Sequence, residues 1–300
     1  MCITSSRSIL DNTYIGAWDI NHPTFGYRHV LAYQNRVKNL AKGPNCMLLH
    51  IQSKEEIKPE WIIDTSYAPT FLTAIYDEID PIPKNDGIAW MSSPTERPNY
   101  VIERGVYNIA ILNNLSPEII DATLKQIPTH KLPSLENGLI QFFKDKFPNF
   151  PLLLCCFDNK DAQQASPILI HFPPLFPEKL MLNTIDSHGG IPDTEKKVGF
   201  HQKLIVGSYK CKNKLGIKLY KYFSEHLYQA LEEFLPKFAT VTDLLHFFNG
   251  PNKDICVDVK NIHENKLPKV YLNILGNIES QQEVEVVQTG NTFSLRRLIK

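Results

Sequence analysis

Apolar and polar residues alternate along the first fifth of the chain in a pattern that is typical of β-strands. Three segments there are rich in β-branched and aromatic side chains. Proline-containing turn sequences, Asn21–Pro23 and Lys42–Pro44, separate the three segments. We therefore predict strands over residues 13–20, 28–37 and 45–52.

Other segments repeat their apolar residues at intervals of three and four, which is the period of a helix. These segments predict helices over 66–79, with Ser66 as the cap, and over 134–147, 219–235 and 241–248. A further helix is expected to begin at Ser116 and Pro117, because serine caps a helix and proline fits its first position.

The remaining apolar segments predict later strands, and their order indicates the fold class. The run 152–157 reads as a buried strand with 167–172 and 179–184 as its partners. Further strands are expected over 100–113, 198–208, 255–259 and 270–275, and a hairpin over 283–298 turns at Thr289–Asn291. Strands come in runs and helices in pairs, which favours an α+β fold with largely antiparallel sheets over a doubly wound one. No internal repeat or Gly/Ser linker divides the chain, so we expect one domain over 1–300.

Composition narrows the classes of partner. The chain has 43% hydrophobic residues, enough for a sizeable core, and its 32 basic residues balance 32 acidic ones. Zero net charge removes the simplest electrostatic case for binding nucleic acid. The most apolar run, 151–157, is far shorter than the roughly 20 residues needed to cross a bilayer. The first residues lack the pattern of a secretory signal, so we expect a cytoplasmic protein, with secretion by a signal-less route left open.

Six cysteines are present, and their spacing fits neither a disulfide framework nor a zinc ribbon. Cys155 and Cys156 are adjacent in a predicted strand, so their side chains should point to opposite faces. Cys46, Cys155, Cys156 and Cys256 read best as buried thiols. The ten histidines form no His-x-His or His-Glu-x-x-His motif. We therefore expect no metal and no cofactor.

Cys2 is the most suggestive residue for chemistry. Removal of Met1 would give it both a thiol and an α-amine, whose pKa lies near 8. The amine could accept the thiol proton, so one residue would supply nucleophile and base. The opposing interpretation is that the position is incidental, because chain ends are usually frayed.

The residues after Cys2 resemble the start of an enzyme family. Met-Cys followed by the segment Tyr14–Asp19 (YIGAWD) is similar to the choloylglycine hydrolase and acid-ceramidase-like N-terminal-nucleophile (Ntn) hydrolases. In those enzymes a hairpin carries a Gly-Arg-Asn-x-Asp type motif. Gly16 and Asp19 match its glycine and aspartate, but Ala17 stands in place of the arginine. The resemblance implies amide hydrolysis, with Asp19 orienting the amine and Arg28 or Arg7 doing the work of the missing arginine.

More of the chain is similar to a group of uncharacterised bacterial proteins that also begin Met-Cys. The similarity runs through the segments HVLAYQNRV, NCMLLHIQ and DTSYAPTFLTAI, which begin at residues 29, 45 and 64. Those proteins share a later His-Asp-Gly loop, which corresponds here to Asp186–Gly190, with Gly189 in place of the aspartate. The similarity implies a single domain that begins at Cys2 and names no substrate.

His188 is a further candidate. It precedes two glycines, so the imidazole would sit on a turn where a ligand can approach the backbone. It could act as a general acid or base, form half of a metal site, or be an ordinary loop histidine.

Two functions follow. The first is hydrolysis of a carbon–nitrogen amide bond in a small-molecule or peptide substrate. Catalysis would use Cys2, Asp19, Arg28 and His188 in an α+β fold of Ntn-like layers. The alternative is a non-catalytic protein-interaction protein, possibly a secreted effector, that uses the Pro-rich loop 81–98 and the Lys-rich stretch 210–221 as contact surfaces.

Overall fold

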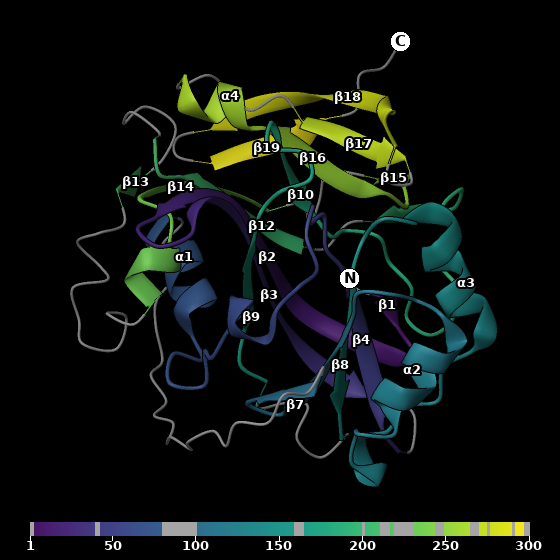
Figure 1. Ribbon diagram of the computed structural model, residues 1–300. Coiled ribbons are helices and arrows are strands. Elements are labelled where there is room, and N and C mark those ends of the chain that lie inside the picture. The colour runs from purple at the N-terminus through teal and green to yellow at the C-terminus, as the bar shows by residue number, and fades with distance from the viewer. Residues whose placement is uncertain are drawn as a thin grey trace.

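The computed structural model shows an α+β fold in which two sheets carry helices on their outer faces (Figure 1). The residues that it describes are 3–39, 43–79, 101–158, 165–199, 202–210, 217–218, 231–243, 249–264, 270–274, 277–289 and 292–296. Cys2 therefore lies outside the described residues, as do Cys211, loop 81–98 and most of 210–221.

The smaller sheet has five strands in the order β1-β4-β8-β7-β6, and all of its pairings are antiparallel. Its central strands are continuous apolar runs because both faces of the sheet are covered. The strands are β1 (Ile3–Thr4), β4 (Asn45–His50), β6 (Val101–Arg104), β7 (Tyr107–Leu112) and β8 (Leu152–Phe157).

The larger sheet has 12 strands, and the order along its path is β10-β16-β17-β18-β19-β14-β12-β2-β3-β9-β5, with β13 pairing β14. β12 runs parallel to β2 and β14 parallel to β19, and the other pairings are antiparallel. The first strands are β2 (Ser8–His22), β3 (Gly26–Asn39), β5 (Ile62–Ile63), β9 (Ile168–Phe172), β10 (Lys179–Leu182) and β12 (Gln202–Ser208). The later ones are β13 (Ile217–Lys218), β14 (Phe238–Asp243), β16 (Asp254–Asp258), β17 (Val270–Ile274), β18 (Asn277–Thr289) and β19 (Thr292–Arg296). A separate pair joins β11 (Lys197–Gly199) to β15 (Asn249–Pro251).

Four α-helices lie within the described residues: α1 (Phe71–Ile79), α2 (Pro117–Leu124), α3 (Asn137–Lys146) and α4 (Val259–His263). Two 3₁₀ turns, η1 (Pro59–Trp61) and η2 (Thr129–Lys131), are shorter still. Ser116 caps α2 by accepting the N–H of Ile119, and Pro117 takes the first helical position, as predicted. α2 and α3 pack beside the five-stranded sheet (Figure 1).

Side-chain alternation divides the core into three parts. Ile15 and Leu31 of the β2–β3 hairpin face Leu153 and Cys155 of the smaller sheet, so this part fills the space between the sheets. A second part lies between the other face of the smaller sheet, which includes Cys156, and α2 and α3. The third part lies between the other face of the larger sheet and α1. The layers therefore follow the order helix, sheet, sheet, helix. Cys155 faces the larger sheet and Cys156 faces α2 and α3, so the two side chains lie on opposite faces of β8, as predicted.

A fully partnered polar cluster joins the two sheets. His50 at the end of β4 contacts Asp254 of β16, with 2.6 Å between Nε2 and Oδ2, and both side chains are at most 2% exposed. The amide of Asn183 donates to Nδ1 and the carbonyl oxygen of His50. Oδ1 of Asp254 accepts the N–H groups of Thr184 and Ile185. Since no side-chain polar atom of His50 or Asp254 lacks a contact, the cluster fastens the sheets without an unsatisfied group.

Three sequence predictions need correction. Strand 152–157 pairs with β4 and β7, whereas 167–172 and 179–182 pair with β3 and β16. The predicted helix 241–248 begins instead as the end of strand β14, because the β-branched residues there pair with β12. Helix 66–79 starts only at Phe71, after a turn that contains Pro69, which disfavours a helix interior.

Several other predictions are confirmed. The three early strands, the strand pair within 100–113 and the hairpin formed by β18 and β19 are present, and Thr289 pairs with Thr292 at the turn. The predicted helix 219–235 lies mostly outside the described residues. The single domain and the Ntn-like version of the α+β class stay predictions.

Candidate functional site

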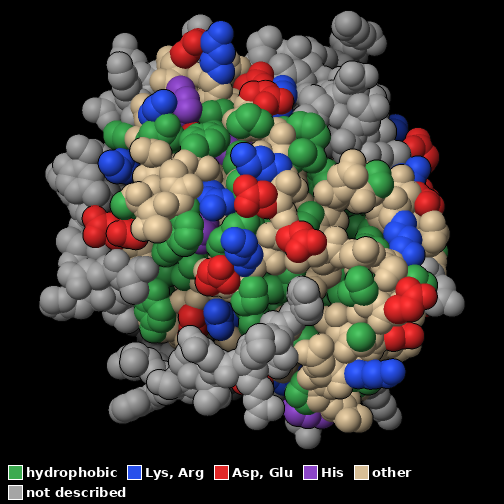
Figure 2. All heavy atoms as spheres, in the orientation of Figure 1, with side chains coloured by type: hydrophobic (Ala, Val, Ile, Leu, Met, Phe, Trp, Pro, Cys, Tyr) green, Lys and Arg blue, Asp and Glu red, His purple; other side chains and the backbone are tan. Residues whose placement is uncertain are grey.

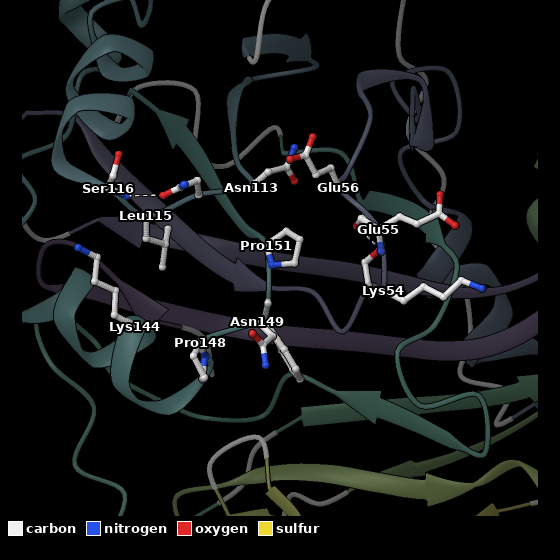
Figure 3. A pocket seen from close by; sticks show the side chains of 13 residues that line it. Lys54, Glu55, Glu56, Asn113, Leu115, Ser116, Lys144, Pro148, Asn149 and Pro151 are labelled. Carbon is white, nitrogen blue, oxygen red and sulfur yellow. Dashed lines mark hydrogen bonds between the residues drawn. The ribbon is translucent and has the colours of Figure 1, made fainter.

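A polar trough of about 570 Å³ lies at one end of the five-stranded sheet (Figure 3). β4 and β7 end at this edge and β8 begins there, so three loops meet around the opening. These loops contribute Ser53–Glu56, Asn113–Ser116 and Pro148–Pro151, and Lys144 of α3 completes the lining. None of these residues was predicted from the sequence to bind a partner, because each loop is an ordinary polar turn and only the sheet brings the three loops together.

Hydrogen bonds hold the rim of the trough in place. The side chain of Asn113 accepts the N–H of Ile57 at 2.7 Å and donates to its carbonyl oxygen at 3.0 Å. The hydroxyl of Ser53 bonds the backbone of Glu55, and the N–H of Ile51 donates to Pro151. These contacts tie the loop after β4 to the other two loops, so the opening is preformed.

The trough carries charges of both signs. Lys54, Glu55 and Glu56 are exposed and Lys144 is half-buried. None of the four makes an ion pair with a residue that the structure describes. Buried Phe150 forms an apolar part of the lining. On the face shown in Figure 2, acidic and basic side chains are likewise interspersed. The lining suits recognition of a polar segment and contains no cysteine or histidine.

His188, one of the residues predicted from sequence, lies beside the N-terminal strand. Its loop contacts this strand through an N–H of Ser8 that donates to the His188 carbonyl and through a bridge between Ile3 and Ser187. Gly189 has φ +127°, and a Cβ there would lie 2.7 Å from the backbone nitrogen of Arg7. Only glycine allows this approach. The loop predicted as functional therefore does meet the start of the described chain.

The side chain of His188 is 40% exposed, and its Nε2 lies 2.9 Å from Oδ1 of Asp186. This contact is the main reason why the pKa of His188 lies above its ordinary value. An imidazolium stabilised by a carboxylate can act as an acid.

Asp19 lies elsewhere, near the far end of β2. Its Oδ2 is 2.7 Å from Nε2 of His263 in α4, while Oδ1 is buried without a hydrogen bond from a described residue. Tyr27 and His29 lie close by, and the Tyr27 hydroxyl contacts Nε2 of His29 at 3.1 Å. Burial, together with the charge of Asp19, raises the pKa of Tyr27. Asp19 thus belongs to a cluster that sequence reasoning did not foresee, because its partner is 244 residues away.

Arg28 points to the opposite face of the same hairpin. Asp19 pairs with His29, whereas Arg28 pairs with Ile20, and neighbouring positions on a strand face opposite sides. The Arg28 guanidinium lies 4.7 Å above the ring of Trp61. Burial lowers the pKa of Arg28, and the charge of Glu55 partly offsets this.

The structure does not bring Asp19 or Arg28 to His188. Ser8, which contacts the His188 loop, and Asp19 lie eleven residues apart on one strand. At about 3.3 Å per residue this separation is roughly 36 Å. Because Cys2 lies outside the described residues, the catalytic roles of Cys2, Asp19, Arg28 and His188 stay predictions.

The four described cysteines, Cys46, Cys155, Cys156 and Cys256, are buried, as predicted. The contact with the Cys46 thiol, followed by burial, raises the pKa of Cys156, which makes it a poor nucleophile. Across the described part of the chain, no group of three or more metal-ligating side chains could hold a metal ion. Nor is any helix in that part both long and apolar enough to span a membrane.

Comparison with known proteins gives distant structural similarity. No protein-family model matches the chain, and no curated protein does. The crystal structure of baculovirus P35 is similar at 11% identity and a TM-score of 0.41, and the match covers 99% of this chain and 89% of P35. Two structures of a mutated baculovirus P35 after caspase cleavage have TM-scores of 0.39 and 0.37, at 11% and 9% identity. They cover 72% and 97% of this chain, and 69% and 93% of their own chains.

Proposed function

We propose that this chain is a protein-interaction protein that binds a polar segment of a partner in the trough at the end of the five-stranded sheet. The composition of the trough is the observation that carries the proposal. Its lining combines lysine, glutamate and asparagine side chains with exposed loop backbone, and it contains neither the cysteine nor the histidine of the predicted amidase site.

The charges favour a partner segment that itself carries both signs. Lys54 and Lys144 would pair with carboxylates, and Glu55 and Glu56 with basic side chains. Such pairs at a solvent-exposed rim contribute more to specificity and to the rate of association than to affinity. Buried Phe150 offers a small apolar contact next to these charges.

Site-specific photo-crosslinking tests the proposal. A photoreactive residue at Asn149, which is exposed within the trough, should capture a discrete partner in cells that express the protein. The matched control is Gln141, which is exposed on α3 outside the trough lining. The double variant Lys54→Glu/Lys144→Glu should abolish capture at Asn149, whereas Lys125→Glu, directly after α2, should not. Equal capture from Asn149 and Gln141, or capture that survives the double variant, would contradict the proposal.

The same assay can be run with purified caspases as a defined class of partner. Caspases are the proteases named above with the P35 structures. Binding of a caspase that the Lys54→Glu/Lys144→Glu variant weakens at least tenfold would identify the partner. Binding that is equal in wild type and variant would place the contact outside the trough.

A second candidate function is hydrolysis of an amide bond by Cys2. One observation favours it: the loop of His188 contacts the N-terminal strand that follows Cys2. Substitution of Cys2 by alanine should then abolish hydrolysis of acyl p-nitroanilides and leave the melting temperature nearly unchanged. Turnover that does not change, or that the wild type lacks, would remove this candidate, and intact mass shows whether Met1 is lost.

A further inference from the structure

Arg28 and His171 form a buried polar cluster in which four nitrogens lack a hydrogen-bond partner among the described residues. β3 and β9 pair with Val30 opposite His171, so Arg28 and His171 are same-face neighbours. The two side chains are 8% and 0% exposed. Nε and Nη1 of Arg28 and both ring nitrogens of His171 make no hydrogen bond with any residue that the structure describes. Four polar atoms are thus unsatisfied in one place.

This arrangement is costly unless something else satisfies it. An unpaired buried donor typically costs about 1–3 kcal/mol, and more when the group is charged. Contact with aromatic rings offsets part of the cost for Arg28, which lies over Trp61 and, at 5.4 Å, over Phe25. The ring contact does not satisfy the N–H groups, which lie in the plane of the guanidinium. Buried polar groups in native structures nearly always have a partner, so these four nitrogens have the capacity to bind one.

Aromatic rings enclose the cluster. Phe25 and Phe234 lie 4.9 and 5.0 Å from the His171 ring, and His22 and Trp61 lie about 6 Å away. Phe25 is 37% exposed in the turn between β2 and β3, so it is the part of the wall that reaches solvent. A low-polarity wall strengthens any charge interaction with Arg28.

The charges around the cluster select the ligand. Arg28 supplies one positive charge, and burial lowers the pKa of His171 to about 4, so His171 is neutral near pH 7. His22 already contacts Glu233, with 3.0 Å between Nε2 and Oε2. Glu55 acts on Arg28 through its charge but makes no ion pair with it among the described residues. Nε and Nη1 of Arg28 therefore still lack an acceptor, and a carboxylate accepts hydrogen bonds from arginine in the plane of the guanidinium.

We infer that Arg28 and His171 form a binding site for a carboxylate, with Arg28 as the charged donor and His171 as a neutral second contact. The carboxylate could belong to a free acid or to an acidic side chain of a polypeptide. Neither Arg28 nor His171 lines the trough, and the existence of the site does not depend on the proposed function.

Titration with two probes tests the site. Sodium acetate represents the free acid, and N-acetyl-aspartate methylamide represents an aspartate within a polypeptide. At constant ionic strength and pH 7, at least one probe should raise the melting temperature of the wild type in a saturable manner, relative to chloride. The tighter probe identifies the source of the carboxylate. Arg28→Met retains the stem over Trp61 and should weaken binding at least about tenfold, since one charge-assisted hydrogen bond contributes 1.5–3 kcal/mol.

Arg104 provides the matched control. Its Nε and Nη1 donate to the carbonyl oxygens of Ile62 and Glu103, so both donors already have partners. Arg104→Met should leave the affinity for the probe unchanged. In the wild type, the Nε–H resonance of Arg28 should move with the probe concentration, which tests the site even where Arg28→Met does not fold. A stationary Arg28 resonance, or an equal response of wild type and Arg28→Met, would overturn the inference.

Discussion

Two buried histidines at different places in the molecule differ in what surrounds them. His50 and His171 are both almost fully enclosed, and both lie against aromatic rings, Phe147 for the first and Phe234 for the second. His50 has a carboxylate on one ring nitrogen and an amide on the other. His171 has neither, and its nearest charged neighbour on the same face is a cation.

The difference separates a structural role from a functional one. A buried histidine whose nitrogens are both satisfied stabilises the junction of the two sheets, and nothing remains for it to bind. A buried histidine beside an unpartnered arginine destabilises the fold in the absence of a ligand. Proteins tolerate such a cost mainly at sites that bind something.

The largest expected effect comes from breaking the satisfied cluster. Asp254→Ala leaves His50 and the N–H groups of Thr184 and Ile185 unpaired in the interior. We expect a loss of about 3–5 kcal/mol in the free energy of unfolding, measured by urea denaturation. Asp258→Ala is the control on the same strand, because its ion pair with Lys179 is closer to solvent, and it should cost about 1 kcal/mol. Similar losses in both variants would remove the special role of the His50 cluster.

The second-largest effect is a loss of stability in acid, which involves His171 and His29. Burial lowers the pKa of each to about 4, below the value of about 6.5 in the unfolded chain. The unfolded chain therefore binds protons at these histidines at a higher pH than the folded protein does. This difference has no effect above pH 6.5 and lowers the stability progressively as the pH falls from 6.5 through 4. We expect each to cost on the order of 2 kcal/mol at pH 4. Denaturation at pH 7, 5.5 and 4.5 should show a shallower pH dependence for His171→Phe than for the wild type, and an identical dependence would contradict the assignment.

The smallest expected effect is that of His171→Phe at pH 7. The substitution removes two unsatisfied nitrogens and keeps a ring of similar shape among Phe25, Phe234 and Trp61. The free energy of unfolding should change by less than about 1 kcal/mol, and stabilisation is the expected direction. A loss comparable with that of Asp254→Ala would show that His171 has partners essential to the fold, and the contrast with His50 would fail.

Much of the local structure could be predicted from the sequence, because it depends on neighbours along the chain. Alternation marked the β2–β3 hairpin, and a serine followed by proline marked the start of α2. Strand partners were harder: β8 lies between β4 and β7, and the strands that follow it in sequence belong to the other sheet. Periodicity shows which face of a strand is buried and does not show which strand covers its edge.

The candidate sites were less predictable than the fold. His188 could be singled out by its glycine turn, and Asp19 and Arg28 by a resemblance near the N-terminus. Their separation follows from strand alternation over a 15-residue strand, which a short motif does not convey. The trough depends on three loops that meet only when β4, β7 and β8 pair. The Arg28–His171 cluster depends on the pairing of β3 with β9, and the sequence did not show that pairing.

The parallel contact between β2 and β12 has a consequence for biosynthesis. It joins residues 13–18 to residues 202–207, which leave the ribosome after about 190 further residues have been made. Until then, the β2–β3 hairpin exposes one row of backbone N–H and carbonyl groups, and such an edge can pair with a neighbouring nascent chain. Completion of the larger sheet is thus a late event, and the time during which the edge of β2 is uncovered is set by the speed of translation through the middle of the message.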